Sequence, residues 1–282
     1  MNNYHTHTFY CGHAGGTVKE YVETAIKNGI KILGFSEHAP FKIFGDRMSY
    51  EDFLQYLKDI EECQKEYSSQ ITILKGLEIE YIEDQLDYIK ELKSKLDYLC
   101  FGAHFYNDGP DILNKSTYEI TSKKQIREYG KYVIRAIKSG LFDFIAHPDL
   151  YMINYPKFDR TCKRVAHQIF KVCEKFDAIL EINANGIRRG LSSKKDGIYY
   201  SYPCYKFWEI GKKYKVKVIV GSDSHNPKNL CDEAFLKANE YARSLGLEIV
   251  DSLSINMSKT KNYKWFRKNV WFYPIQKSNN VE

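Results

Sequence analysis

The sequence predicts a single α/β barrel of parallel strands, with a histidine-rich site at one rim. Short runs rich in branched and aromatic residues alternate with longer amphipathic stretches along the 282 residues. Repeated βα units of this kind are typical of a parallel sheet. No linker, internal repeat or low-complexity block divides the chain, so one barrel accounts for its length better than two domains. An open, doubly wound sheet is the rival architecture.

Seven segments have the composition of buried strands. They are rich in Ile, Val, Phe, Tyr and Leu, and Gly, Pro, Asn or Asp residues bound them. The predicted strands span residues 2–7, 30–36, 71–80, 96–104, 141–147, 178–183 and 216–221.

A helical segment follows each predicted strand. Thr17 and Ser49 are predicted helix caps, because each has an acidic residue three positions later, as in a capping box. The predicted helices span residues 17–29, 49–68, 84–95, 122–139, 159–177, 202–214 and 229–244.

Two regions follow from this pattern. Residues 1–250 are assigned to the barrel domain. Residues 251–282 mix basic and aromatic side chains, and we expect this C-terminal extension to pack on the barrel, with its last residues frayed.

The composition is that of an ordinary globular protein, with 43% hydrophobic and 28% charged residues. No apolar run approaches the roughly 18 residues of a membrane span, and the N-terminal residues lack a signal-peptide pattern. Seven cysteines, an odd number without close pairs, favour a reducing cytoplasm. The net charge of +6 predicts no nucleic-acid partner, but it suits an anionic substrate.

Seven of the eight histidines fall at or just after the C-terminal ends of the predicted strands. In a parallel barrel these ends meet at one rim, where catalytic groups gather. His5 and His7 are two residues apart, so on a strand both point to the same face. The eighth histidine, His167, lies on the polar side of a helix and is expected in solvent. The polar residues at the strand ends are His5, His7, His13, His38, Glu78, Glu80, His104, His147, Asp223 and His225.

Imidazoles and carboxylates gathered at one rim indicate a metal centre. Zn, Fe and Mn all accept such ligands. Because each ion takes three or four protein ligands, the set is large enough for three divalent ions. One histidine at a strand end would be ordinary, whereas seven at the same rim favour a shared chemical role.

Seven strings along the chain resemble the motifs of the PHP (polymerase and histidinol phosphatase) family, in the family's order. The CGHA string shortly after the HTH string, together with the EIN-type strand, resembles the histidinol-phosphatase branch of the family. The set is specific, whereas any one string alone would be weak. The strings are HTHTFYCGHA (5–14), FSEHA (35–39), KGLEIEY (75–81), GAHF (102–105), AHPDL (146–150), EINANG (181–186) and GSDSH (221–225).

The resemblance implies a distorted (β/α)7 barrel of the PHP type, with three metal ions at the C-terminal ends of the strands. It implies that Glu78 bridges the first two ions, although Glu80 has the same strand parity and stays an alternative. Glu37 is expected either to orient His38 or to be a surface carboxylate. The implied ligand sets are His5, His7, Glu78 and Asp223 for the first ion, Glu78, His104 and His147 for the second, and His13, His38 and His225 for the third.

A cluster of cations favours a dianionic phosphate monoester as substrate. We expect a metal-bridging hydroxide to attack phosphorus, and Asp223 to orient the water or move its proton besides ligating. Arg188 is the preferred phosphate clamp, and Arg160 and Arg189 are weaker ones, because a guanidinium fork matches phosphate oxygens.

The resemblance further implies hydrolysis of L-histidinol phosphate to L-histidinol and phosphate, in histidine biosynthesis. Two alternatives stay open. One is another PHP phosphoesterase, acting on a phosphodiester, a nucleotide or phosphotyrosine. The other belongs to a different class, a metal-binding protein without catalysis.

Overall fold

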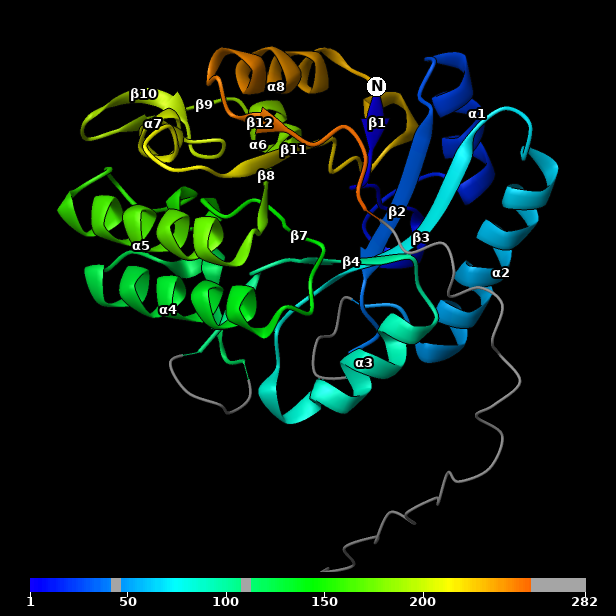
Figure 1. Cartoon of the computed structure of the whole chain (residues 1–282), viewed down its shortest axis with the longest axis horizontal. Coiled ribbons are helices and arrows are strands. Elements are labelled where there is room, and N and C mark those ends of the chain that lie inside the picture. The colour runs from blue at the N-terminus through cyan, green and yellow to red at the C-terminus, as the bar shows by residue number, and fades with distance from the viewer. Residues whose placement is uncertain (42–46, 108–112, 255–282) are drawn as a thin grey trace, which may run out of the picture.

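Eight parallel strands form one curled sheet whose neighbours follow each other in chain order. The computed structural model describes residues 1–41, 47–107 and 113–254 (Figure 1). In spatial order the strands are β1 (Asn2–Asn3), β2 (Ile32–His38), β3 (Thr72–Ile79), β4 (Tyr98–Phe101), β7 (Phe144–Ile145), β8 (Ile179–Asn183), β11 (Lys217–Gly221) and β12 (Glu248–Ile249).

The segments that continue β1 and β11 come together. Thr6, just after β1, forms a parallel bridge with Ser224, just after β11, and the His7 amide donates to the Ser224 carbonyl at 2.9 Å. The barrel therefore closes between the β1 and β11 segments, at the rim that carries the histidines. The expected PHP-type barrel is confirmed, with β12 as a short eighth strand, and the open-sheet alternative is wrong.

Helices cover the outside of the sheet, one after most strands (Figure 1). Capping boxes begin α1 at Thr17 and α2 at Ser49, as the sequence predicts. The helices are α1 (Val18–Lys27), α2 (Tyr50–Glu66), α3 (Leu86–Ser94), α4 (Lys123–Ser139), α5 (Arg160–Phe176), α6 (Ala184–Arg188), α7 (Tyr205–Gly211) and α8 (Glu233–Ser244). Short 3₁₀ turns lie at Phe9–Cys11, Glu83–Gln85, Thr117–Glu119, Leu150–Met152 and Pro227–Asn229.

The connection between β8 and α7 differs from the expectation. It contains α6 and an antiparallel hairpin of β9 (Leu191–Lys194) and β10 (Gly197–Tyr200), so the predicted helix 202–214 shrinks to α7. An Asp–Gly pair at 196–197 is the hairpin signal that the sequence carried. A second small pair joins β5 (Phe105–Tyr106) to β6 (Lys115–Ser116).

An apolar layer fills the barrel interior beneath the histidine-bearing rim, and Tyr4 and Tyr98 are its largest side chains. Inward residues of neighbouring strands pack there, among them Leu74, Phe144 and Ile219. The Tyr98 ring has room because Gly34 and Gly76 lack side chains; a Cβ on Gly76 would lie 2.3 Å from that ring. The remaining core lies between the sheet and the helices.

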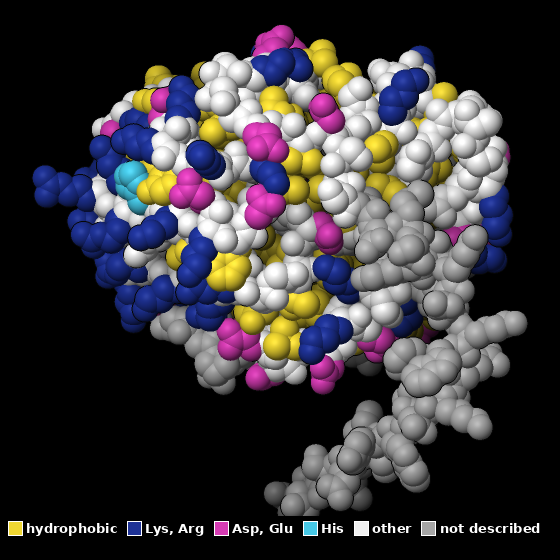
Figure 2. Space-filling model, in the orientation of Figure 1, with side chains coloured by type: hydrophobic (Ala, Val, Ile, Leu, Met, Phe, Trp, Pro, Cys, Tyr) yellow, Lys and Arg dark blue, Asp and Glu magenta, His cyan; other side chains and the backbone are white. Residues whose placement is uncertain are grey.

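The surface carries its basic side chains unevenly. Lysine and arginine side chains gather over the α4 and α5 side of the molecule (Figure 2).

All seven cysteines are free. Among the described residues, no helix has the length and apolar character that a membrane crossing requires.

The structure describes only the first residues of the C-terminal extension 251–282, which is expected to pack on the barrel. Leu253 is buried with the apolar layer of the barrel, and its amide donates to the Tyr4 hydroxyl at 3.3 Å. Residues 255–282 lie outside the described residues, so the predicted packing of the extension stays a prediction.

Tyr98→Phe tests the barrel interior. The Tyr98 hydroxyl lies 2.7 Å from both the Tyr4 and Phe35 carbonyls, and the residue is fully buried. Losing this donor is expected to lower the free energy of unfolding by about 1–2 kcal/mol in a denaturant titration. The control Tyr50→Phe, whose hydroxyl contacts Glu91 at the surface, should change it by less than about 0.5 kcal/mol. Equal effects would contradict this account.

Candidate metal centre

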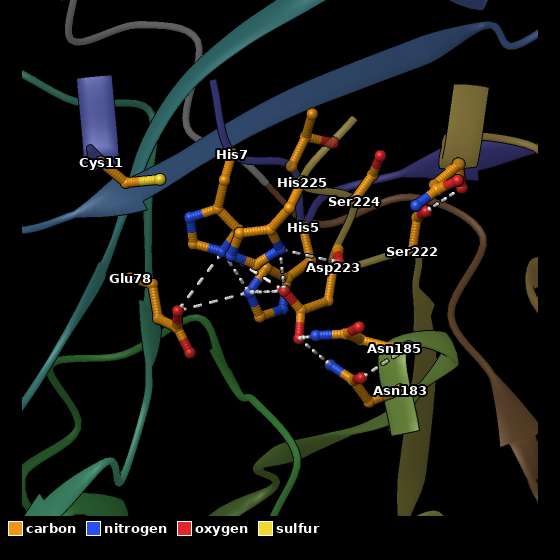
Figure 3. A network of polar contacts seen from close by, with 12 residues as sticks. His5, His7, Cys11, Glu78, Asn183, Asn185, Ser222, Asp223, Ser224 and His225 are labelled. Atoms are coloured by element: carbon orange, nitrogen blue, oxygen red, sulfur yellow. Dashed lines mark hydrogen bonds and ion pairs between the residues drawn. The ribbon is translucent and has the colours of Figure 1, made fainter. Parts of the chain in front are cut away.

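Seven histidines and two carboxylates converge on the mouth of the barrel. Figure 3 shows how several of them point toward one another from separate strands. The eighth histidine, His167, lies apart on α5 and contacts the Tyr214 hydroxyl at 2.8 Å, partly buried rather than fully in solvent. The structure thus brings together all nine residues that the sequence predicted as ligands.

Four ligand atoms form a tight group at the first predicted site. The Nε2 atoms of His5 and His7 lie 3.1 Å apart. Glu78 Oε2 lies 3.4 and 3.5 Å from these two nitrogens. Asp223 Oδ1 lies 3.7 and 3.4 Å from them. Four tetrahedral ligands at about 2.0–2.1 Å from a zinc ion stand roughly 3.4 Å from one another, so these spacings fit one ion.

Glu78 occupies the centre of the cluster. Its Oε1 lies 2.8 Å from His147 Nε2 and 3.4 Å from His104 Nε2, on the side away from the first group. Glu80 lies on the far side of the His104 ring from Glu78. Its Oε1 accepts from Arg47 at 2.8 Å and lies 3.2 Å from His104 Nδ1. This geometry favours Glu78 over Glu80 as the bridging group, and Glu80 is placed to orient His104.

The third predicted group lies nearest to solvent. The Nε2 atoms of His13 and His225 are 3.2 Å apart. The His38 ring stacks on His13 with centroids 5.3 Å apart, while its Nδ1 lies 3.2 Å from Glu78 Oε2. His38 also offers a ligand atom within 4.8 Å of those of His7 and His225. His38 is therefore placed between the first and third groups.

Five carboxylates are buried around this mouth, each at most 6% exposed. Arg47 pairs with Glu80 there, whereas Glu78 lies 2.8 Å from the His147 imidazole and Asp223 lies 3.4 Å from the His7 imidazole. Burying carboxylates in this number costs free energy unless positive charge compensates them. The five are Glu37, Glu78, Glu80, Glu181 and Asp223.

The surrounding charges shift the pKa values strongly. Burial would raise the pKa of Glu78, but His104, His5 and His147 outweigh it and hold that pKa well below its usual range. Burial would lower the pKa of His7, but Asp223 and Glu37 raise it to about 9. Without a bound cation, protons on such imidazoles balance the carboxylates; a bound cation replaces those protons.

The backbone is adapted to the cluster at four positions. A Cβ on Gly102 would lie 2.3 Å from Glu78 Oε1, and one on Gly221 would lie 1.7 Å from Glu181 Oε1. His147 and Asp223 have φ values of 29° and 46°, in the left-handed region. Such conformations cost about 1 kcal/mol or more and gather at functional sites.

Glu37 does not orient His38, and it is not a surface carboxylate. Its Oε1 accepts from both the backbone amide and the hydroxyl of Thr8, and its Oε2 lies 3.7 Å from His7 Nδ1. Adjacent strand residues point to opposite faces, so Glu37 turns away from His38. Its neighbour in the cluster is His7.

The arginines differ from the sequence expectation. Arg188 lines the mouth, but its guanidinium is engaged by both oxygens of Asp232, at 2.7 and 3.2 Å, and by backbone carbonyls that include Ser222 and Asn229. It braces the loop after β11 instead of offering a free clamp. Arg160 is exposed at the start of α5 and does not line the cavity, so placing it at the site was wrong.

A cavity of about 380 Å³ opens above the ligand cluster. Arg189, a weaker clamp candidate of the sequence analysis, lines it together with Arg47, Tyr118 and Tyr202. The sequence favours Arg188 over Arg189, but in the structure Asp232 engages the guanidinium of Arg188, which ends α6, and Arg189 is the next residue.

The residues fit divalent cations. The donors are imidazole nitrogens and carboxylate oxygens, the ligands of Zn, Fe and Mn in proteins. The mutual distances in the first group suit one tetrahedral ion, and the excess of buried carboxylates requires positive charge. His5, His147 and Asp223 likewise offer atoms within 4.8 Å of one another.

Comparison with known proteins agrees with this geometry. The family model described as PHP domain matches residues 3–185. A probable histidinol-phosphatase of Deinococcus radiodurans is 27% identical over 233 residues, which cover 79% of this chain and 85% of that protein. A probable phosphatase of Clostridium acetobutylicum is 30% identical over 223 residues, covering 78% of this chain and 77% of that protein.

A solved structure has the same fold. The histidinol phosphate phosphatase of Lactococcus lactis, in complex with Zn, L-histidinol and phosphate, superposes with a TM-score of 0.68. It is 19% identical, and the match covers 89% of this chain and 96% of that chain.

Gly102→Ala tests the central position of Glu78. The added Cβ would press on Glu78 Oε1, so we expect the carboxylate to move and metal retention to fall at least tenfold, measured by elemental analysis after dialysis. Gly15→Ala is the matched control, because its Cβ would meet only Asn226 at 3.9 Å. Full metal retention in Gly102→Ala would contradict the assignment.

Proposed function

The chain belongs to the PHP domain family, and from that premise we propose that it is a metal-dependent phosphate monoester hydrolase whose substrate is L-histidinol phosphate. The observation that carries the proposal is the position of Glu78, whose two oxygens face five imidazoles from four segments of the chain. Relatives named as histidinol-phosphatases, from Deinococcus radiodurans and from Bacillus subtilis, support the choice of substrate.

The proposed ligands are those of the sequence analysis, holding three divalent cations. His5, His7, Glu78 and Asp223 would hold the first, Glu78 would share the second with His104 and His147, and His13, His38 and His225 would hold the third. When bound, such cations neutralise phosphate oxygens and lower the pKa of a coordinated water toward neutrality.

Asp223 is proposed to orient the attacking water. Its Oδ2 accepts from the side-chain amides of Asn183 and Asn185, at 3.1 and 3.2 Å, which leaves Oδ1 directed at the imidazoles. Burial would raise the pKa of Asp223, but His5 and His7 hold it well below its usual range, so the group stays anionic and accepts hydrogen bonds. It also lines the cavity where substrate would bind.

Arg189 replaces Arg188 and Arg160 as the proposed phosphate clamp. It lines the cavity, and no carboxylate within the described ranges forms an ion pair with it. Its planar fork suits two phosphate oxygens. Tyr118 and Tyr202, which also line the cavity, would give the rest of the substrate two aromatic surfaces.

The cavity limits the alternatives. About 380 Å³ suits a small monoester better than a polymer. The buried, fully assembled donor set favours catalysis over a metal-holding role alone. The free cysteines support a reducing location, which we propose to be the cytoplasm.

Removing metal tests the hydrolase proposal. Dialysis of the full chain against a chelator should abolish phosphate release from L-histidinol phosphate, and Zn²⁺ or Mn²⁺ should restore it, because the cations supply the charge that activates water. Undiminished phosphate release from the metal-stripped protein would sink the proposal.

A substrate panel separates the proposed substrate from its alternatives. Initial rates of phosphate release are compared for L-histidinol phosphate, phosphotyrosine, a nucleoside monophosphate and a phosphodiester. We expect L-histidinol phosphate to have the highest kcat/KM by at least tenfold. A higher value for any other compound would reassign the substrate while keeping the phosphoesterase.

Arg189→Ala tests the revised clamp. Loss of a charge-assisted contact worth about 1.5–3 kcal/mol should lower kcat/KM for L-histidinol phosphate about 10–100-fold. Arg160→Ala removes an equal charge outside the cavity and should stay within about twofold of wild type. The reverse pattern would return the role to Arg160.

A further inference from the structure

The Glu181–Asn183 segment of β8 supplies no predicted ligand, yet it reaches the centre of the site. Both side chains point into the barrel, as alternate residues of one strand do. Glu181 is 0% exposed and Asn183 is 1% exposed. A buried carboxylate and a buried amide need hydrogen-bond partners. Here the partners are the proposed ligands, the two side chains themselves and the backbone at the start of α6.

Glu181 contacts two of the proposed ligands. Its Oε1 lies 2.7 Å from His5 Nδ1, the ring nitrogen that faces away from the ligand group. Its Oε2 accepts the backbone amide of His147 at 3.0 Å and the Asn183 side-chain amide at 2.8 Å. A carboxylate on Nδ1 keeps the proton there, so the lone pair of His5 stays on Nε2.

Asn183 connects two carboxylates. Its Oδ1 accepts from the backbone amides of Asn185 and Gly186, at 2.9 and 3.3 Å, where it caps α6. That leaves its Nδ2 for Glu181 Oε2, at 2.8 Å, and for Asp223 Oδ2, at 3.1 Å. Both hydrogens of one amide are therefore used, each on a different carboxylate.

We propose that Glu181 and Asn183 form one positioning unit for the metal centre, with Asn183 holding Glu181 and Asp223 in register so that His5 Nε2 and Asp223 Oδ1 face the same ion. The inference rests on the proposed metal centre. An amide suits position 183 because it donates twice without adding charge, whereas an aspartate there would place a third carboxylate against two others. Gly221 completes the unit, since a Cβ there would collide with Glu181 Oε1 at 1.7 Å.

The test measures the affinity for Zn²⁺ in the metal-stripped full chain, by competition with a chromophoric chelator, together with the Tm of the metal-free protein. Glu181→Gln and Asn183→Ala should each weaken Zn²⁺ binding about 10–100-fold. The double variant should lose at most about twice the fold-change in Zn²⁺ affinity that the more severely affected single variant loses. The two losses should not multiply, because both residues act through the same contacts.

Two control variants carry the same chemical changes away from the site. Glu128→Gln alters a buried glutamate that pairs with Lys115, and Asn239→Ala removes an amide that donates to the Phe235 carbonyl on α8. Both should bind Zn²⁺ as tightly as wild type. Cobalt substitution adds a second readout, because altered ligand geometry in Asn183→Ala should shift the visible bands of bound Co²⁺.

The outcomes separate the positioning unit from the proposed function. A lower Tm of the metal-free variants with unchanged Zn²⁺ affinity and Co²⁺ bands would overturn the unit, and so would multiplicative losses in the double variant. A wild-type chain that binds Zn²⁺ but releases no phosphate would contradict the hydrolase alone, and the affinities would still decide on the unit. A wild-type chain without affinity for Zn²⁺ or Co²⁺ would overturn both.

Discussion

The burial of negative charge at the barrel mouth is the constraint on which the rest of the structure depends. Glu78 and Asp223 lie among imidazoles, with Glu37, Glu80 and Glu181 immediately behind them, all nearly inaccessible to water. Carboxylates in such a place need compensating positive charge. Arg47 supplies some of it for Glu80. Divalent cations held by the imidazoles would supply the remainder.

The fold produces this concentration by alternation along parallel strands. On β3 the inward residues run from Leu74 through Gly76 to Glu78, and on β11 from Ile219 through Gly221 to the Asp223 that follows. The lower residues pack the apolar layer, the glycines leave room for large neighbours, and the upper residues carry the polar groups. The bridge between Thr6 and Ser224 then joins the segment that follows β1 to the segment that follows β11.

Much of the fold and most of the proposed ligand set could be predicted from the sequence, because strand ends in a parallel barrel share one rim. The alternation of side chains along a strand could not decide whether Glu78 or Glu80 is the bridging ligand, because both point to the same face. In the structure Arg47 pairs with Glu80, which leaves Glu78 among the imidazoles. Parity could have corrected Glu37, since a residue next to His38 on a strand points to the opposite face. The sequence placed Arg188 above Arg189 as a clamp and could not show that Asp232, 44 residues away in the chain, engages Arg188.

The central claim is that cations complete the cluster, and X-ray diffraction at the absorption edge of the bound metal tests it most directly. The account predicts one anomalous peak enclosed by His5 Nε2, His7 Nε2, Glu78 Oε2 and Asp223 Oδ1, and another beside Glu78 Oε1 facing His104 and His147. Crystals of protein supplied with metal that lack both peaks, with ordered water in their place, would contradict it.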